Sequence, residues 1–421
     1  MAPAPAHNAI DSELEAARSL ARSGHVTEAE RAFDAVLAAH PDCVEALRFL
    51  ASSAFARSDA ARTIALLSRA SKSEPRNAQI FYELGLAYRA AERFDAARYV
   101  LERAVELGGD APRARLLLAH VLELDQRPDR ALLQYFRALA DARRHGHWRN
   151  DADIDASLRG LVVHARAYAI EKRNALFSQI LGALRTARPD ARWNRVEGAL
   201  ANYLGTRPLA PTDTRQNPGF MYTPGIATSF FLDDERFSFP VADLARALAA
   251  CAGEARACLS AFGHAAPGSG LATAAVFERG VERAALRTCA PAMRAALIAA
   301  PLARVLNHGP DCEFVHLPAR AQTRQLVGRA NSRCRVVVNL TASAPVDVVV
   351  FGEARRLAAG EHAIIDPSFA HHFVGASGAD VVAQILWFDV WHPDLSADEQ
   401  HALAALIESA IDFETRVNEL P

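Results

Sequence analysis

The sequence predicts an α+β multidomain protein, in which an all-α helical-repeat domain precedes a β-sheet domain with flanking helices. A 34-residue period of small and large apolar residues in the first third of the chain predicts the repeats. From about residue 215, β-branched runs separated by Gly, Pro, Ser and Asp predict the sheet. With 421 residues, 51% hydrophobic and 23% charged, the chain is long enough for two or three domains. We expect domains at 1–205 and 218–421, joined by a linker at 206–217 that is rich in Pro, Thr, Gly and Asn.

The repeat signal consists of four sets of equivalent positions, each spaced 34 residues apart. The residues of one set are small, which lets the helices approach closely, and those of another are large and fill the adjacent holes. This helix-turn-helix period resembles a tetratricopeptide solenoid, and residues 81–88 are its clearest unit. The sets are Ala17, Ala51, Gly85 and Ala119; Ala29, Thr63, Ala97 and Ala131; Phe33, Leu67, Leu101 and Tyr135; and Val36, Ala70, Ala104 and Ala138.

Stacked repeats create a concave surface, so we expect a peptide-binding groove along the first helix of each pair. The basic side chains at the predicted groove positions favour an acidic partner. The alternative is a solvated inner face that binds no ligand. The candidate groove residues are Arg48, Tyr82, Leu86, Arg89, Arg113, His120 and Glu123.

Composition excludes several classes of function. The formal net charge is −2, which argues against generic nucleic-acid binding. The six cysteines are scattered without a CxxC pair, as expected of reduced thiols in a cytoplasmic protein. The N-terminus has neither the basic nor the apolar region of a signal peptide, and no long uncharged apolar run predicts a membrane span.

Three apolar, β-branched segments predict strands at 333–341, 346–351 and 381–388. Many short strands in succession are typical of an antiparallel sandwich or a jelly roll. The segment from Ser396 to Glu399 has the pattern of a capping box, and it predicts the start of a C-terminal helix that runs to Leu420.

Several segments of the second domain resemble the aspartyl/asparaginyl β-hydroxylase family. The resemblance spans about 218–396 and implies a double-stranded β-helix, or jelly roll, that binds Fe(II) and 2-oxoglutarate. Helical repeats also precede the jelly roll in members of this family. The segments are Tyr222-Thr-Pro-Gly-Ile226, Phe314-Val-His-Leu317, the run 324–340 with Gly328, Asn331 and Arg335, Asp366-Pro-Ser-Phe-Ala-His371, and Asp389-Val-Trp-His-Pro-Asp-Leu395.

The residues that would carry the chemistry depart from the family pattern. The resemblance implies two iron-binding histidines, which fall on His371 and on Leu326. It also implies four polar contacts to 2-oxoglutarate, and only the one at Arg335 is retained. An apolar pocket disfavours a dianion, because a buried charge without paired donors is costly. The other three positions are Val315, Val337 and Ala383.

The sequence therefore favours a peptide- or protein-binding pseudo-hydroxylase that binds Fe(II) weakly and forms no succinate from 2-oxoglutarate. One alternative is an active hydroxylase of Asp, Asn or related residues with a rearranged metal site, for which His362 is a further candidate ligand. Another is an enzyme of a different class that uses the same pocket. His371 could also be a satisfied structural side chain, and Arg335 could pair with Asp366 or Asp389 instead of a cosubstrate.

Overall fold

The structure is a computed structural model that describes residues 5–265, 271–342, 344–375 and 382–420. The chain folds as two compact units, a repeat unit, Met1–Arg173 with Glu414–Pro421, and a β unit, Asn174–Phe413. The segment 206–217 contains no helix or strand, and its role as a domain linker stays a prediction.

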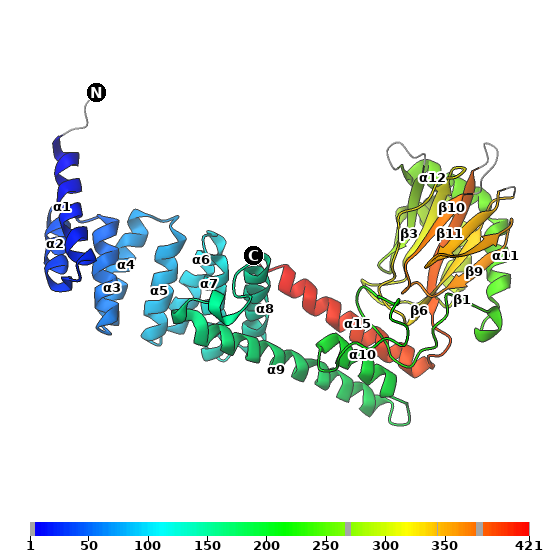
Figure 1. The fold of residues 1–421 in the computed structure, drawn as a ribbon, viewed down its shortest axis with the longest axis horizontal. Helices are drawn as coiled ribbons and strands as arrows, with labels where there is room; N and C mark the ends of the chain where they lie inside the picture. Colours follow the sequence, from blue (N-terminus) through cyan, green and yellow to red (C-terminus); the bar gives the residue numbers. More distant parts are fainter. Residues whose placement is uncertain (1–4, 266–270, 343, 376–381, 421) are drawn as a thin grey trace. The chain divides into compact units, whose positions relative to one another are not determined.

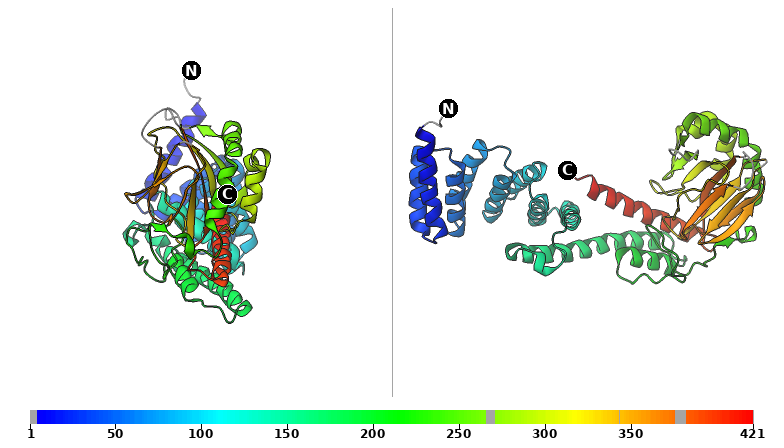
Figure 2. Two further views of the ribbon diagram at one scale, coloured as in Figure 1. Left: turned by 90° about the vertical axis from the view of Figure 1, so that its right-hand side faces the viewer. Right: turned by 45° about the horizontal axis from the view of Figure 1, so that its top comes forward.

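The repeat unit contains successive pairs of antiparallel helices (Figure 1; Figure 2, right). All four sets of positions with the 34-residue period are buried, which confirms the predicted register. A Cβ atom added to Gly85 would lie 2.4 Å from Leu101 Cδ2, so an alanine there, as at the equivalent Ala51 and Ala119, would require the Leu101 side chain to move. The helices are α1 (Pro5–Arg22), α2 (Val26–Ala39), α3 (Val44–Ala56), α4 (Ala60–Ser73), α5 (Ala78–Ala90), α6 (Phe94–Glu106), α7 (Ala111–Leu124) and α8 (Pro128–Arg144).

Two helices follow the repeat pairs, the long α9 (Ala156–Ala187) and the short α10 (Asn194–Leu204), and the helix α15 (Ala397–Asn418) lies near the C-terminus. The capping box that was predicted for α15 is confirmed, because Ser396 N donates to Glu399 Oε2 and Glu399 N donates to Ser396 Oγ. In the part of the chain that the structure describes, no helix is long and apolar enough to cross a lipid bilayer.

The β unit contains two antiparallel sheets (Figure 1). The large sheet has the order β1-β9-β6-β11-β5-β3-β2, with β4 paired to β3, and the small sheet has the order β10-β7-β8. The strands predicted from the sequence correspond to β6, β7 and β11. The bounds are β1 (Phe231–Leu232), β2 (His264–Ala265), β3 (Ala272–Glu278), β4 (Val281–Glu282), β5 (Cys312–Leu317), β6 (Arg333–Asn339), β7 (Val346–Val350), β8 (Glu353–Leu357), β9 (His362–Ile365), β10 (His371–Gly375) and β11 (Ala383–Trp391).

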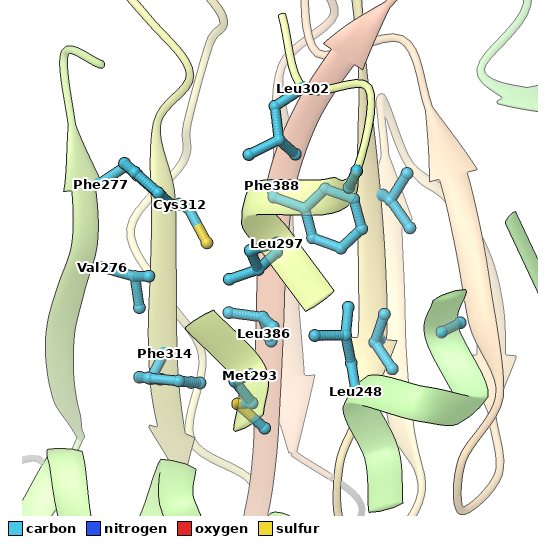
Figure 3. Close-up of a cluster of buried hydrophobic side chains, with 14 of the residues drawn as sticks. Leu248, Val276, Phe277, Met293, Leu297, Leu302, Cys312, Phe314, Leu386 and Phe388 are labelled. Carbon is cyan, nitrogen blue, oxygen red and sulfur yellow. The ribbon is translucent and has the colours of Figure 1, made fainter. Parts of the chain in front are cut away.

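Both faces of the large sheet are covered by apolar side chains. On one face, Leu248, Met293 and Leu297 from the helices pack against Phe314 and other strand residues (Figure 3). On the other face, a second buried cluster joins the large sheet to the small one. Every residue of β6 is buried, as expected for a strand covered on both faces. The covering helices are α11 (Val241–Ala250), α12 (Ala252–Phe262), α13 (Ala284–Cys289) and α14 (Pro291–Ala299).

Candidate functional site

The predicted groove residues lie on α3, α5 and α7, the first helices of three successive pairs. Arg48 Nε donates to Glu83 Oε2 at 3.1 Å, which links α3 to α5. Arg89 Nη1 lies 3.2 Å from His120 Nδ1, which links α5 to α7. We call the surface formed by Arg48, Tyr82, Leu86, Arg89, Arg113, His120 and Glu123 the first-helix face.

Two of the arginines on the first-helix face are paired with acids. Arg48 is bonded to Glu83, and Arg113 Nε lies 3.4 Å from Asp110 Oδ2. The guanidinium of Arg113 also lies 5.4 Å from the ring centroid of Tyr82. This pairing reduces the cationic character that the sequence indicated. The face therefore combines paired charges with the mostly buried ring of Tyr82, and its basic character is weaker than the sequence indicated.

Glu123 connects the face to Tyr135, a position of the 34-residue period, and to His164, which the period did not reveal. Glu123 Oε2 accepts hydrogen bonds from Tyr135 Oη and from His164 Nε2, both at 2.8 Å. Burial and the neighbouring Arg89 lower the pKa of His120. His164 belongs to the long helix α9, beyond the last repeat of the predicted register, so no periodic signal in the sequence marks its position.

Within the β unit, Arg335 is the centre of a buried polar cluster between the two sheets. Its Nε donates to Asp389 Oδ1 at 2.8 Å and its Nη2 to Asp389 Oδ2 at 3.2 Å. Its guanidinium carbon lies 3.6 Å from the ring centroid of Trp387. The side chains of Arg335 and Asp389 are only 6% and 5% exposed. Of the two acids that the sequence left open, Asp389 is the one that pairs with Arg335.

His371 completes the cluster as a neutral imidazole. Its Nδ1 lies 2.9 Å from the carbonyl oxygen of Phe369, to which it donates, so Nε2 is left as the acceptor for Arg335 Nη1 at 3.1 Å. Burial, and after it the charge of Arg335, lower the pKa of His371 to about 3. The ring nitrogen that a metal would need is therefore already engaged by a guanidinium.

The structure brings Leu326 directly opposite His371. The two residues form an antiparallel bridge, with backbone N···O distances of 2.7 and 2.9 Å. Directly opposite residues in an antiparallel pair project to the same side, so the leucine side chain lies beside the imidazole. Val315, Val337 and Ala383 belong to the buried apolar cluster between the sheets, and Leu326 packs against it.

The other histidines near these strands have different surroundings. His362 Nε2 lies 2.9 Å from both carboxylate oxygens of Asp234. His316 and His372 neighbour Val315 and His371 along their strands, so they project to the opposite faces. Among the described residues, no group of three or more His, Cys, Asp or Glu side chains is arranged to hold a metal ion.

The segments that carry the family resemblance form structural hydrogen bonds. Asn331 accepts from Thr223 N at 2.7 Å and donates to Thr223 O at 2.8 Å, which fixes the segment containing Thr223 beside the start of β6. Asp366 Oδ1 accepts from both the backbone N and the hydroxyl of Ser368. Burial raises the pKa of Asp366 to about 6. A Cβ atom at Gly328 would lie 2.9 Å from the carbonyl oxygen of Pro367.

Comparison with known families gives a match in the N-terminal helices. Residues 14–78, 50–112 and 82–147 each match the tetratricopeptide repeat family. The N-terminal helices are tetratricopeptide repeats. Such repeats indicate protein–protein interaction, since stacked helix pairs expose extended binding surfaces. The matched residues include the whole first-helix face.

Solved structures similar to this chain include several of MamA. A crystal structure of MamA is 23% identical, with a TM-score of 0.30, over 38% of this chain and 95% of that chain. MamA from Desulfovibrio magneticus RS-1 is 19% identical, with a TM-score of 0.30, over 32% of this chain and 76% of that chain. No curated protein matches the sequence.

Proposed function

We propose that this protein recruits a peptide or protein partner through its tetratricopeptide repeats and carries a jelly-roll domain of hydroxylase type whose iron and 2-oxoglutarate site is degenerate. The observation that carries the first part is the first-helix face, which combines paired charges, the ring of Tyr82 and the half-buried His120 on three successive repeats. Tyr82 and Arg113 also line a cavity of about 300 Å³, a volume suited to one or two side chains.

The strand order supports a jelly roll. From β5 in the large sheet the chain passes to residues 322–326, which bridge to β10 of the small sheet. It then returns to the large sheet at β6 and crosses to the small sheet for β7 and β8. It goes back to the large sheet at β9, crosses to the small sheet at β10, and ends in the large sheet at β11. Repeated crossing between two antiparallel sheets that share one core is the pattern of a double-sheet jelly roll.

The side chains at the implied metal and cosubstrate positions support the degenerate site. Leu326 offers no donor atom, and His371 Nε2 accepts from Arg335. Asp389 holds the guanidinium fork that 2-oxoglutarate would need. The residues present therefore do not fit Fe(II) and 2-oxoglutarate, since one imidazole and an apolar pocket provide neither a chelate nor donors for a dianion.

Charge reversal on the first-helix face tests the binding function. We expect the double variant Arg89→Glu, Arg113→Glu to weaken binding of the partner by roughly tenfold or more, because it reverses two charges on the face and removes the contacts of Arg89 with His120 and of Arg113 with Tyr82. The measurement is affinity capture with the full chain, followed by a titration of each captured partner.

The matched control reverses two arginines on the second helices. Arg103 and Arg130, on α6 and α8, are 44% and 52% exposed and pair with acids on the surface. The variant Arg103→Glu, Arg130→Glu should retain wild-type capture. Equal capture by both double variants would remove the first-helix face as the binding site.

Restoring a second imidazole tests the degenerate site. We expect wild-type protein to bind Co(II), a spectroscopic substitute for Fe(II), weakly and to release no succinate from 2-oxoglutarate. Leu326→His places an imidazole beside His371, so it should raise Co(II) affinity at least about tenfold, with the metal displacing Arg335 Nη1 from His371 Nε2. The measurement is a visible-absorption titration, with succinate assayed in parallel.

Val327→His is the control for the added imidazole, because Val327 neighbours Leu326 but is 45% exposed. It should leave Co(II) affinity near that of the wild type. Stoichiometric Fe(II) in the wild-type protein, together with 2-oxoglutarate-dependent succinate, would refute the degenerate site and favour the active hydroxylase.

A further inference from the structure

The β unit contains a cavity of about 940 Å³, whose wall includes Leu326 and Arg335 of the degenerate site and extends beyond them to Asp311 and Glu313. Its wall comes from strands β3, β5 and β11, the segment 324–327 and the end of α12. This volume lies at the upper end of the range for small-molecule sites, which are typically about 300–1,000 Å³. The chemistry of the wall therefore indicates what kind of ligand the cavity suits.

Two carboxylates are the main polar groups of the wall. Asp311 and Glu313 are two residues apart at the start of β5, so they project to the same face. Asp311 Oδ1 accepts from the backbone N of Arg279 at 2.8 Å, and Glu313 accepts from the hydroxyl of Thr273. Neither carboxylate forms an ion pair with any residue that the structure describes. Burial is the largest influence on both, and it raises the pKa of each.

Two of the cations in the wall are already neutralised. Arg335 is bonded to Asp389, and Arg283 is paired with Glu278. Arg324 is exposed at the edge of the cavity, where water screens its charge. Arg335 and Arg324 therefore supply only a partial counter-charge, which burial outweighs, and a bound cation would relieve the remaining cost of desolvating the two carboxylates.

The rest of the wall suits the apolar stem of a cation. Phe277, Leu326 and Val327 line the cavity, together with Phe262, which is 37% exposed. Trp387 is 7% exposed, and its Nε1–H has no hydrogen-bond partner within the described residues. The wall therefore also contains an unpaired donor, which a ligand with a carbonyl or carboxylate oxygen beside its cationic stem would satisfy.

We propose that this cavity binds an organic cation, an amine or guanidinium on an alkyl stem, with Glu313 and Asp311 as its counter-charges. The cation belongs either to a basic side chain of a peptide or to a free diamine-type molecule. In both cases the cavity would recognise the same group, a cation on an alkyl stem. The proposal does not depend on partner binding by the repeats, and the two can fail separately.

Titration calorimetry on the full chain with three probes tests this site. N-acetyl-arginine methylamide represents the peptide source, agmatine the free cation, and N-acetyl-citrulline methylamide is the neutral isostere. We expect at least one cationic probe to bind, and the neutral isostere to bind at least tenfold more weakly than its arginine counterpart. Preference for the arginine amide over agmatine would assign the cavity to a peptide side chain, and the reverse would assign it to a free cation.

Glu313→Gln should weaken binding of the preferred probe at least tenfold, because the amide keeps the hydrogen bond from Thr273 but removes the negative charge. Asp311→Asn is a second, independent variant and should also weaken binding of that probe. The control is Glu353→Gln, an exposed glutamate on β8 that should leave affinity unchanged. Absence of binding by both cations, equal binding of the neutral isostere, or wild-type affinity in both cavity variants would overturn the proposal.

Discussion

Replacing Asp389 with alanine is expected to lower the free energy of unfolding of the β unit by about 3–5 kcal/mol, because it leaves the buried guanidinium of Arg335 without a counter-charge. The loss is large since both oxygens of Asp389 are used and both side chains are almost completely buried. Urea unfolding monitored by tryptophan fluorescence measures it, with Trp387 stacked directly on Arg335 as the local probe.

An exposed pair on the small sheet provides the matched control. Arg356 Nε lies 2.8 Å from Asp347 Oδ1, and the arginine side chain is 62% exposed. Asp347→Ala should cost less than about 1 kcal/mol, because water screens that pair. Replacing both buried partners, by Arg335→Met with Asp389→Leu, should recover much of the loss. A loss below about 1 kcal/mol for Asp389→Ala would show that the buried pair does not stabilise the fold.

Replacing His308 with phenylalanine is expected to make the β unit less sensitive to acid. His308 is completely buried, it lies against Phe220 with ring centroids 5.0 Å apart, and neither ring nitrogen has a partner in the described part of the chain. Burial, and then the charge of Arg333, lower its pKa from 6.5 to about 2. The imidazole thus stays neutral in the folded protein but takes up a proton in the unfolded chain below about pH 6.5.

Acid therefore favours the unfolded state through this histidine. Its contribution to stability is complete above about pH 6.5 and is lost as the pH falls toward about 2. The stability of His308→Phe relative to the wild type should rise by about 1.4 kcal/mol for each pH unit below 6.5, or roughly 3 kcal/mol near pH 4.5. Urea unfolding at a series of pH values measures the difference.

The control substitutes phenylalanine at His401, an exposed position on α15, where the difference from wild type should change little with pH. If the difference between His308→Phe and the wild type stays constant from pH 7 to 4.5, then His308 is not a buried neutral imidazole. The backbone carbonyl of His308, which accepts from Arg333 Nη1, is present in both proteins and does not affect the comparison.

The repeats were predictable because their signal is local. Each helix pair is contiguous in the chain and contains one member of every set, so burial follows from the period without knowledge of distant contacts. The same holds for the capping box of α15, which uses residues three apart. His164 escaped prediction because α9 follows a different register, although it shares Glu123 with the last repeat.

The candidate site in the β unit was predictable in part. The family resemblance placed Leu326 and His371 in equivalent roles, and the structure pairs them in an antiparallel bridge between the segment 322–326 and β10. It left the partner of Arg335 open between two aspartates, because the choice depends on strand register across 54 residues of chain. The stacking of Trp387 on Arg335 and the unpaired carboxylates of Asp311 and Glu313 had no sequence signal.

The sequence by itself determined the helical repeats, the main strands and the absence of polar groups at Val315, Leu326, Val337 and Ala383. These are properties of residue type and short-range periodicity. Only the tertiary structure decided that Arg335 is held by Asp389 and His371, and that a large cavity lies beside them. Such contacts form where strands that are distant in the chain come together. Which side chains meet at those places depends on how the sheets pack, not on the local sequence.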